Sequence, residues 1–132
     1  MKLYKFVKQG RGGVLGSLAN KVAYPETPIT VYEPGKDTYP EYGHLMCYGS
    51  VREGHSFLEQ PGYQLWLVDA DVVDVDVPRI VGPSMFPYRW EIVKRFWRNY
   101  ARFLETEPWH HTVPTPPRTV FCSRVRLVEF IG

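Results

Sequence analysis

YQLWLVDADVVDVDV, residues 63 to 77, is the strongest β-strand pattern in this chain of 132 residues. Apolar and polar residues alternate through its first half, which is typical of a strand with one buried face. The carboxylates then change parity near Val72, because Asp69 and Asp71 stand at odd positions and the next two aspartates stand at even positions. One continuous strand would turn the two pairs to opposite faces, so we expect a bulge or turn near Val72.

Shorter strand patterns lie on both sides of this stretch. The Glu33-Pro34-Gly35-Lys36 segment between two of them is predicted to be a turn, since Pro favours the second position of common turns. The predicted strands span residues 3–7, 29–32, 44–48 and 120–131, and residues 113–117 read as an extended polyproline-like connection.

The last strand has two distinct faces in this interpretation. Its alternation places Phe121, Val125 and Leu127 on one face, and Arg124 and Arg126 on the other. We therefore expect the three apolar side chains to share one core.

Two helices are predicted. Ser50-Val51-Arg52-Glu53 forms a capping box, which indicates a short helix that runs toward Gln60. One long helix is expected from Tyr88 to about Glu105, ended by Pro108. Its predicted buried stripe follows i, i+3, i+4 spacing and consists of Ile92, Val93, Phe96, Trp97, Tyr100 and Leu104.

These elements predict an α+β fold with a mostly antiparallel sheet, one short helix and one long helix, in a single compact domain over residues 1–132. Twenty aromatic residues, 15% of the chain, argue against disorder, and 12 Pro with 11 Gly argue against a helical bundle. The chain shows no secretory signal or membrane span. We expect a cytoplasmic protein, of the producing or an infected cell, with Cys47 and Cys122 as reduced thiols.

The charges fall into three blocks. Residues 1–25 carry a net charge of +5, residues 26–78 carry −8 and residues 79–132 carry +5. One interpretation is that the acidic middle pairs with the basic ends inside one fold. The other is a bipolar surface that binds a partner, through the cations Lys94, Arg95, Arg98 and Arg102 and the aspartates Asp69, Asp71, Asp74 and Asp76.

The amino-terminal part resembles a known family. Its segments are Leu3-Tyr4-Lys5-Phe6-Val7, Gly43-His44-Leu45-Met46-Cys47 and Gln64-Leu65-Trp66-Leu67-Val68. In this order they resemble a family of small uncharacterised bacterial and phage domains that open with a "YKF" strand, over residues 1–82. The resemblance implies a fold and an accessory role in a phage or mobile element, and it implies no activity.

Metal and cofactor chemistry finds little support in the sequence. His44 and Cys47 are the candidate ligand pair, but a three-residue step on a strand turns them to opposite faces. The aspartates of residues 69–76 lack the glycine and glutamate of a calcium-binding loop. We predict no metal and no cofactor.

Two alternatives stay open beside a binding role. An ADP-ribosyltransferase-like enzyme that uses NAD would take Tyr48 or Ser50 from a middle strand and Glu129 from a late one. A nucleic-acid-binding protein would use the basic face of the long helix. The function that we expect is a small non-catalytic interaction module with a protein partner, because aromatic residues and Arg most often anchor protein interfaces.

Overall fold

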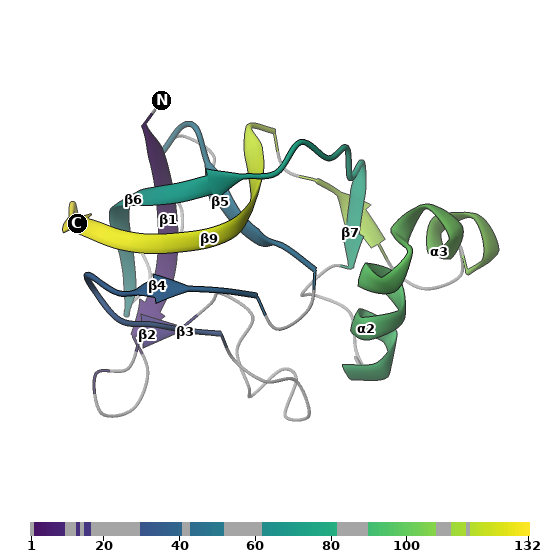
Figure 1. Ribbon diagram of the computed structural model, residues 1–132, viewed down its shortest axis with the longest axis horizontal. Helices are drawn as coiled ribbons and strands as arrows, with labels where there is room; N and C mark the ends of the chain where they lie inside the picture. Colours follow the sequence, from purple (N-terminus) through teal and green to yellow (C-terminus); the bar gives the residue numbers. More distant parts are fainter. Residues whose placement is uncertain are drawn as a thin grey trace.

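Four strands that lie far apart in the sequence close into a small antiparallel barrel. The computed structural model describes residues 2–9, 13, 15–16, 30–40, 43–51, 62–81, 90–107, 112–115 and 117–132. The ring consists of β1 (Leu3–Gln9), β6 (Tyr63–Val72), β9 (Thr119–Phe130) and β5 (Leu45–Tyr48). β1 pairs with β6, β6 with β9 and β9 with β5, and the single pair Tyr4–Tyr48 joins β5 back to β1 (Figure 1).

Three two-residue strands extend this ring. β2 (Leu15–Gly16) pairs with β1, β3 (Val31–Tyr32) pairs with β2, and β4 (Asp37–Thr38) pairs with β9. Each pairing between described residues is antiparallel, so the predicted mostly antiparallel sheet is confirmed. The architecture is richer in sheet than the α+β prediction expected, because two short helices stand beside a closed barrel (Figure 1).

The turn before β4 has the predicted form. The backbone N–H of Lys36 donates to the carbonyl of Glu33 at 3.0 Å, and Gly35 has a φ of 79°. A positive φ at the third position defines a type II turn, for which glycine is the natural residue.

Irregular pairing between β6 and β9 sets which side chains enter the barrel. The register shifts between Asp71 and Val72, where the sequence predicted an irregularity. Opposite this point, Ser123 of β9 is left without a partner residue, so that Cys122 and Val125 both face the barrel core. Phe121 therefore faces outward, toward the helices.

This bulge corrects the predicted single face of the last strand. Val125 and Leu127 lie in the barrel core, as expected, but Phe121 belongs to a second cluster with Phe96 and Phe103. Simple alternation fails because an inserted residue reverses the parity of every position beyond it.

A second, two-stranded sheet was not predicted. β7 (Arg79–Val81) pairs with β8 (Thr112–Pro114), and the Arg79 side chain donates to the hydroxyl and the carbonyl oxygen of Thr112 at 2.9 and 2.7 Å. The extended connection predicted over residues 113–117 is therefore a strand at its beginning. Its prolines obscured the strand, because Pro lowers strand propensity and is confined to edges.

The predicted long helix is divided. α2 (Trp90–Arg98) ends before Asn99 and α3 (Tyr100–Thr106) begins after it. Asn99 has an extended backbone, with φ of −160°, and its side-chain oxygen accepts from the N–H of Arg102 at 3.2 Å. Phe103 of α3 is buried, at 2% exposure, and packs edge-on against Phe96, although the predicted stripe did not include it.

The helices pack beside the barrel around the second cluster. Its buried members are Val77, Ile80, Phe96, Phe103 and Phe121, with Met46, Trp97 and Tyr100 packed against them. No helix among the described residues has the length and apolar character to cross a membrane. The short helix predicted from Ser50 toward Gln60 falls mostly outside the described residues.

Candidate functional site

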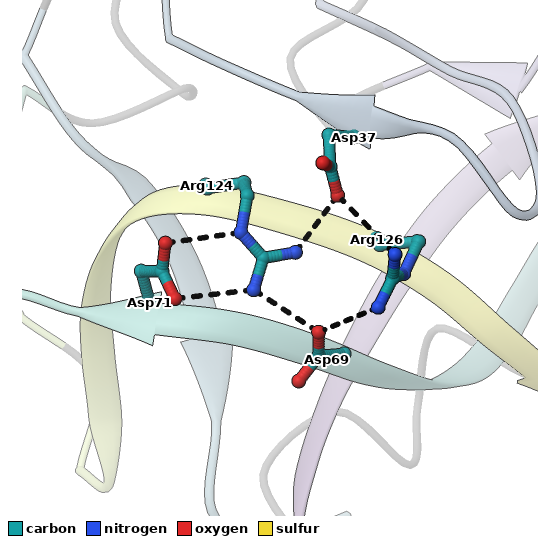
Figure 2. Close-up of polar contacts among 5 residues, drawn as sticks. All are labelled: Asp37, Asp69, Asp71, Arg124 and Arg126. Atoms are coloured by element: carbon teal, nitrogen blue, oxygen red, sulfur yellow. Dashed lines mark hydrogen bonds and ion pairs between the residues drawn. The ribbon is translucent and has the colours of Figure 1, made fainter.

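Five charged side chains form a network on the outer face of the barrel. Arg124 and Arg126 project from β9, between Asp37 of β4 and the two aspartates Asp69 and Asp71 of β6 (Figure 2). The register explains the arrangement, because Arg126 stands opposite both Asp37 and Asp69, and Arg124 stands opposite Asp71.

Arg124 is the centre of this network. Its guanidinium binds both oxygens of Asp71 at 3.0 and 3.1 Å, and it contacts Asp37 at 2.8 Å and Asp69 at 3.0 Å. Arg126 adds a contact to Asp69 at 2.9 Å. Such a planar fork with several N–H donors suits paired carboxylates.

These contacts change the titration of the groups. The hydrogen bond to Arg124 holds the pKa of Asp71 below its ordinary value. Hydrogen bonds to Asp71, Asp37 and Asp69 raise the pKa of Arg124. Both shifts favour the charged forms of Asp71 and Arg124, so this ion pair is maintained near neutral pH.

Half of the predicted acidic partner surface is thus engaged within the chain. Asp69 and Asp71 are paired with arginines, as the intramolecular interpretation of the charge blocks expected. Asp74 and Asp76 are exposed in the segment after β6 and lie outside this network.

The predicted basic residues lie on both sides of the helix break. Arg95 and Arg98 are in the last turn of α2, where cations are stabilised by the helix dipole, and Arg102 is in α3. Arg95 pairs with Glu107 at 3.0 Å. Arg98 and Arg102 are exposed, and their side chains have no ion pair within the described ranges. We call Lys94, Arg95, Arg98 and Arg102 the cationic helical surface.

A buried lysine forms a third polar feature, inside the barrel. Lys5 is 7% exposed, between the inward-facing Leu3 and Val7. Its ammonium donates to the carbonyl oxygen of Met46 at 2.6 Å and lies 5.4 Å from the centre of the Tyr32 ring. Lys5 therefore ties β1 to β5 where backbone pairing between the two strands is limited to one described residue pair.

Lys5 shares this interior with two free cysteines, Cys47 and Cys122. Burial by itself lowers the pKa of Lys5, but the attraction of the ionisable Tyr32, Cys47 and Tyr48 outweighs it and raises this pKa. A hydrogen bond from Cys122 lowers the pKa of Cys47, assisted by the charge of Lys5. Both cysteines are 0% exposed, so this cluster is part of the core.

The candidate metal pair is separated by the fold. Cys47 faces the barrel interior, whereas the His44 ring lies on the helix side. There it meets the rings of Trp97 and Phe121 edge-on, with ring centres 5.5 and 6.1 Å away. Burial lowers the pKa of His44. Across the described part of the chain, no three His, Cys, Asp or Glu side chains gather in a way that would hold a metal ion.

The residues of the enzyme alternative lie on different strands of the barrel. Tyr48 stands opposite Tyr4, Tyr4 stands opposite Leu67, and Leu67 stands opposite Glu129. Strands β1 and β6 therefore lie between Tyr48 and Glu129 on this side of the ring, where neighbouring strands are about 5 Å apart. The enzyme alternative with Tyr48, Ser50 and Glu129 accordingly stays a prediction.

Comparison of the chain with known protein families, with curated proteins and with solved structures found no match. The resemblance of residues 1–82 to small bacterial and phage domains accordingly stays a prediction.

Sequence reasoning missed two parts of this picture. It offered pairing of the acidic middle with the basic ends, but not which aspartates of β6 meet which arginines of β9, because that depends on which strands become neighbours. It also missed Lys5. The signal for Lys5 was present in the alternation Leu3, Lys5, Val7, which places a charge at an inward position.

Proposed function

We propose that this protein is a small non-catalytic interaction domain that binds an acidic protein partner through the cationic helical surface. The observation that carries the proposal is the state of Arg98 and Arg102, which are exposed and without an ion pair in the described residues. Unpaired surface cations attract partners of opposite charge and orient them during encounter.

The rest of the charge distribution supports this choice of surface. The acidic residues Asp37, Asp69 and Asp71 are held by Arg124 and Arg126 on the barrel, so they do not neutralise the helices. Among the described residues, Arg98 and Arg102 therefore remain available for a second molecule.

A protein partner fits this surface better than a nucleic acid does. Glu105 and Glu107 lie in or directly after α3, and Arg95 already pairs with Glu107. The whole chain has a net charge of only +2. Binding to a phosphate backbone usually rests on a denser set of cations.

The setting of this domain is also part of the proposal. We place it in the cytoplasm of the producing or infected cell, where its free cysteines stay reduced, as an accessory protein of a phage or mobile element. This setting rests on the resemblance of residues 1–82 and on the composition of the chain.

Fluorescence anisotropy with a labelled poly-glutamate peptide and a labelled single-stranded DNA tests the binding surface. The double variant Arg98→Glu/Arg102→Glu should bind the peptide at least about tenfold more weakly at low salt. The control Lys2→Glu/Lys36→Glu makes the same charge change on exposed barrel positions and should keep most of the affinity.

Three outcomes would contradict the proposal. The peptide fails to bind the wild-type protein at low salt, or both double variants lose the same affinity. In the third outcome, the DNA binds more tightly than the peptide and with a steep salt dependence, which would favour the nucleic-acid alternative.

A further inference from the structure

The end of the barrel formed by β2, β3 and the start of β6 is hollow. A cavity of about 380 Å³ opens there, lined among others by Gln9, Leu15, Val31, Tyr32, Gln64 and Trp66, which we call the barrel mouth. This size lies within the usual range for small-molecule sites. In Figure 1, β2 and β3 lie at the end of the molecule away from α2 and α3, so this cavity is separate from the cationic helical surface.

The mouth carries polar side chains at positions that face inward. Gln9 stands opposite Leu15, and Gln64 stands opposite Val7. Leu15 and Val7 belong to the barrel core, and residues directly opposite in a sheet share a face. Both amides therefore point to the interior side of the sheet, where apolar residues are the rule.

Trp66 is held as a rigid wall of this cavity. Its indole N–H donates to the side-chain oxygen of Gln64 at 3.0 Å. The Phe130 ring meets it edge-on, with ring centres 5.6 Å apart. A ring fixed in this way loses little conformational entropy when a ligand stacks on it. Since the Gln64 oxygen is already engaged, its amide N–H groups are left to interact with a ligand.

The charges at the mouth favour an uncharged ligand. Among the described lining residues only Glu33 is charged, and its carboxylate pairs with Lys36 at 2.8 Å. Through its described lining residues, the mouth therefore offers aromatic surface, two amides and apolar walls, and no free cation to hold a phosphate.

We propose that the barrel mouth binds a nucleobase-type heterocycle, which is a flat, uncharged ring with hydrogen-bonding groups along its edge. The ring stacks against Trp66, and the amides of Gln9 and Gln64 bind its edge. Stacking on aromatic side chains accepts any base, and amide groups supply both donors and acceptors for such an edge. The ring is either that of a free nucleoside or that of a base in a single strand.

An NMR titration of the full-length protein tests this site, with adenosine, uridine, glucose and a short oligo(dA) as probes. We expect a saturable shift of the Trp66 indole N–H and of the Gln9 and Gln64 amide signals with a nucleoside at up to millimolar concentration. A response to oligo(dA) that is tighter than to adenosine identifies a base within a strand, and an equal or weaker response identifies a free nucleoside.

Two variants of the mouth and one control complete the test. Gln9→Ala should weaken binding about fivefold without disturbing the core, because the Gln9 side chain is exposed. Trp66→Leu should weaken it about 5- to 150-fold. Tyr39→Ala removes an aromatic side chain that is 65% exposed and outside the cavity, and it should leave the affinity unchanged.

The proposal is overturned by any of three results. No nucleoside produces a saturable shift in the folded wild-type protein, glucose produces the same shifts at the same concentrations, or Gln9→Ala binds as tightly as Tyr39→Ala. If Trp66→Leu does not fold, the comparison of Gln9→Ala with Tyr39→Ala still decides the test, since neither of these two substitutions alters the core.

Discussion

At the scale of single residues, Lys5 departs most from the pattern of a barrel core. An ammonium at 7% exposure is costly unless it is hydrogen-bonded. Lys5 meets this condition through the carbonyl oxygen of Met46 and the face of the Tyr32 ring. Because the pKa of Lys5 is raised in the folded protein, its charged form stabilises the fold.

Replacing Lys5 with methionine should lower the free energy of unfolding by about 1–3 kcal/mol at neutral pH, because the carbonyl oxygen of Met46 loses its donor. The stabilisation from the charge of Lys5 is complete when the pH lies below 10.5, which is the ordinary pKa of lysine. It disappears as the pH rises through the higher pKa that Lys5 has in the folded state. Urea unfolding should therefore show a difference between wild type and Lys5→Met that narrows above that pH. Lys2→Met, at an exposed position, is the control. A difference that widens with rising pH would contradict this account.

Tyr32 gives a second prediction at this scale. Its hydroxyl is buried and makes no hydrogen bond of ordinary geometry to the described residues, although it lies near enough to the Lys5 ammonium to help raise the pKa of that group. Tyr32→Phe should therefore leave the free energy of unfolding unchanged or raise it by up to about 1 kcal/mol. Urea denaturation measures the change. A loss of more than about 1 kcal/mol would show instead that the hydroxyl is hydrogen-bonded in solution.

At the scale of elements, Asn99 decides that one predicted helix becomes two. An asparagine at this position caps α3 by accepting from the N–H of Arg102. Phe96, Trp97, Tyr100 and Leu104 of the predicted stripe belong to the cluster under the helices. The division was missed, since the i, i+3, i+4 pattern contains no information on a break that a side-chain hydrogen bond stabilises.

Asn99→Ala should lower the free energy of unfolding by about 1 kcal/mol, because the cap is lost. Asn99→Asp keeps an acceptor oxygen and should retain most of the stability. Chemical denaturation of both variants provides the comparison. If Asn99→Ala has the same free energy of unfolding as the wild type, the cap does not contribute to stability and the break between α2 and α3 does not depend on it.

The strands show which elements can be predicted from the alternation of apolar and polar residues. Residues 63–72 and 3–7 were predicted because their alternation is local and uninterrupted. β7 and β8 were missed, because three residues flanked by prolines have no period to detect. For the candidate site, too, the local pattern was predictable and the long-range pairing was not. The charged residues were identified, but the pairing of Arg124 with Asp71 depends on the register between two distant strands.

At the scale of the molecule, β9 joins two cores. Its inward residues, including Cys122, complete the barrel, and the adjacent Phe121 completes the cluster under the helices. Gly43 contributes to the same junction, since a Cβ atom at this position would collide with the Trp97 ring. The two cores are separate sets of buried residues, so we expect them to differ in local stability.

Phe96→Ala should destabilise the helical side by about 3–5 kcal/mol, because a ring that is 0% exposed leaves a cavity. Native-state hydrogen exchange should show lost protection in α2 and α3 while β1, β6 and β9 remain protected. Val7→Ala, a substitution in the barrel core, is the matched variant and should lower protection throughout the chain. Equal loss of protection in the barrel and the helices of Phe96→Ala would mean that the two cores unfold as one unit.

The sequence by itself determined the main strands, the turn at Gly35, the core positions of Phe96 and Trp97 in α2 and the uneven distribution of charge. These are local properties, carried by residues within a few positions of each other. Only the tertiary structure decided that the barrel closes and that Lys5 points into it. It also decided that Asp69 and Asp71 form ion pairs with Arg124. Alternation defines two faces of a strand, but the partner of each face, and the register of the pairing, depend on contacts between residues far apart in the chain.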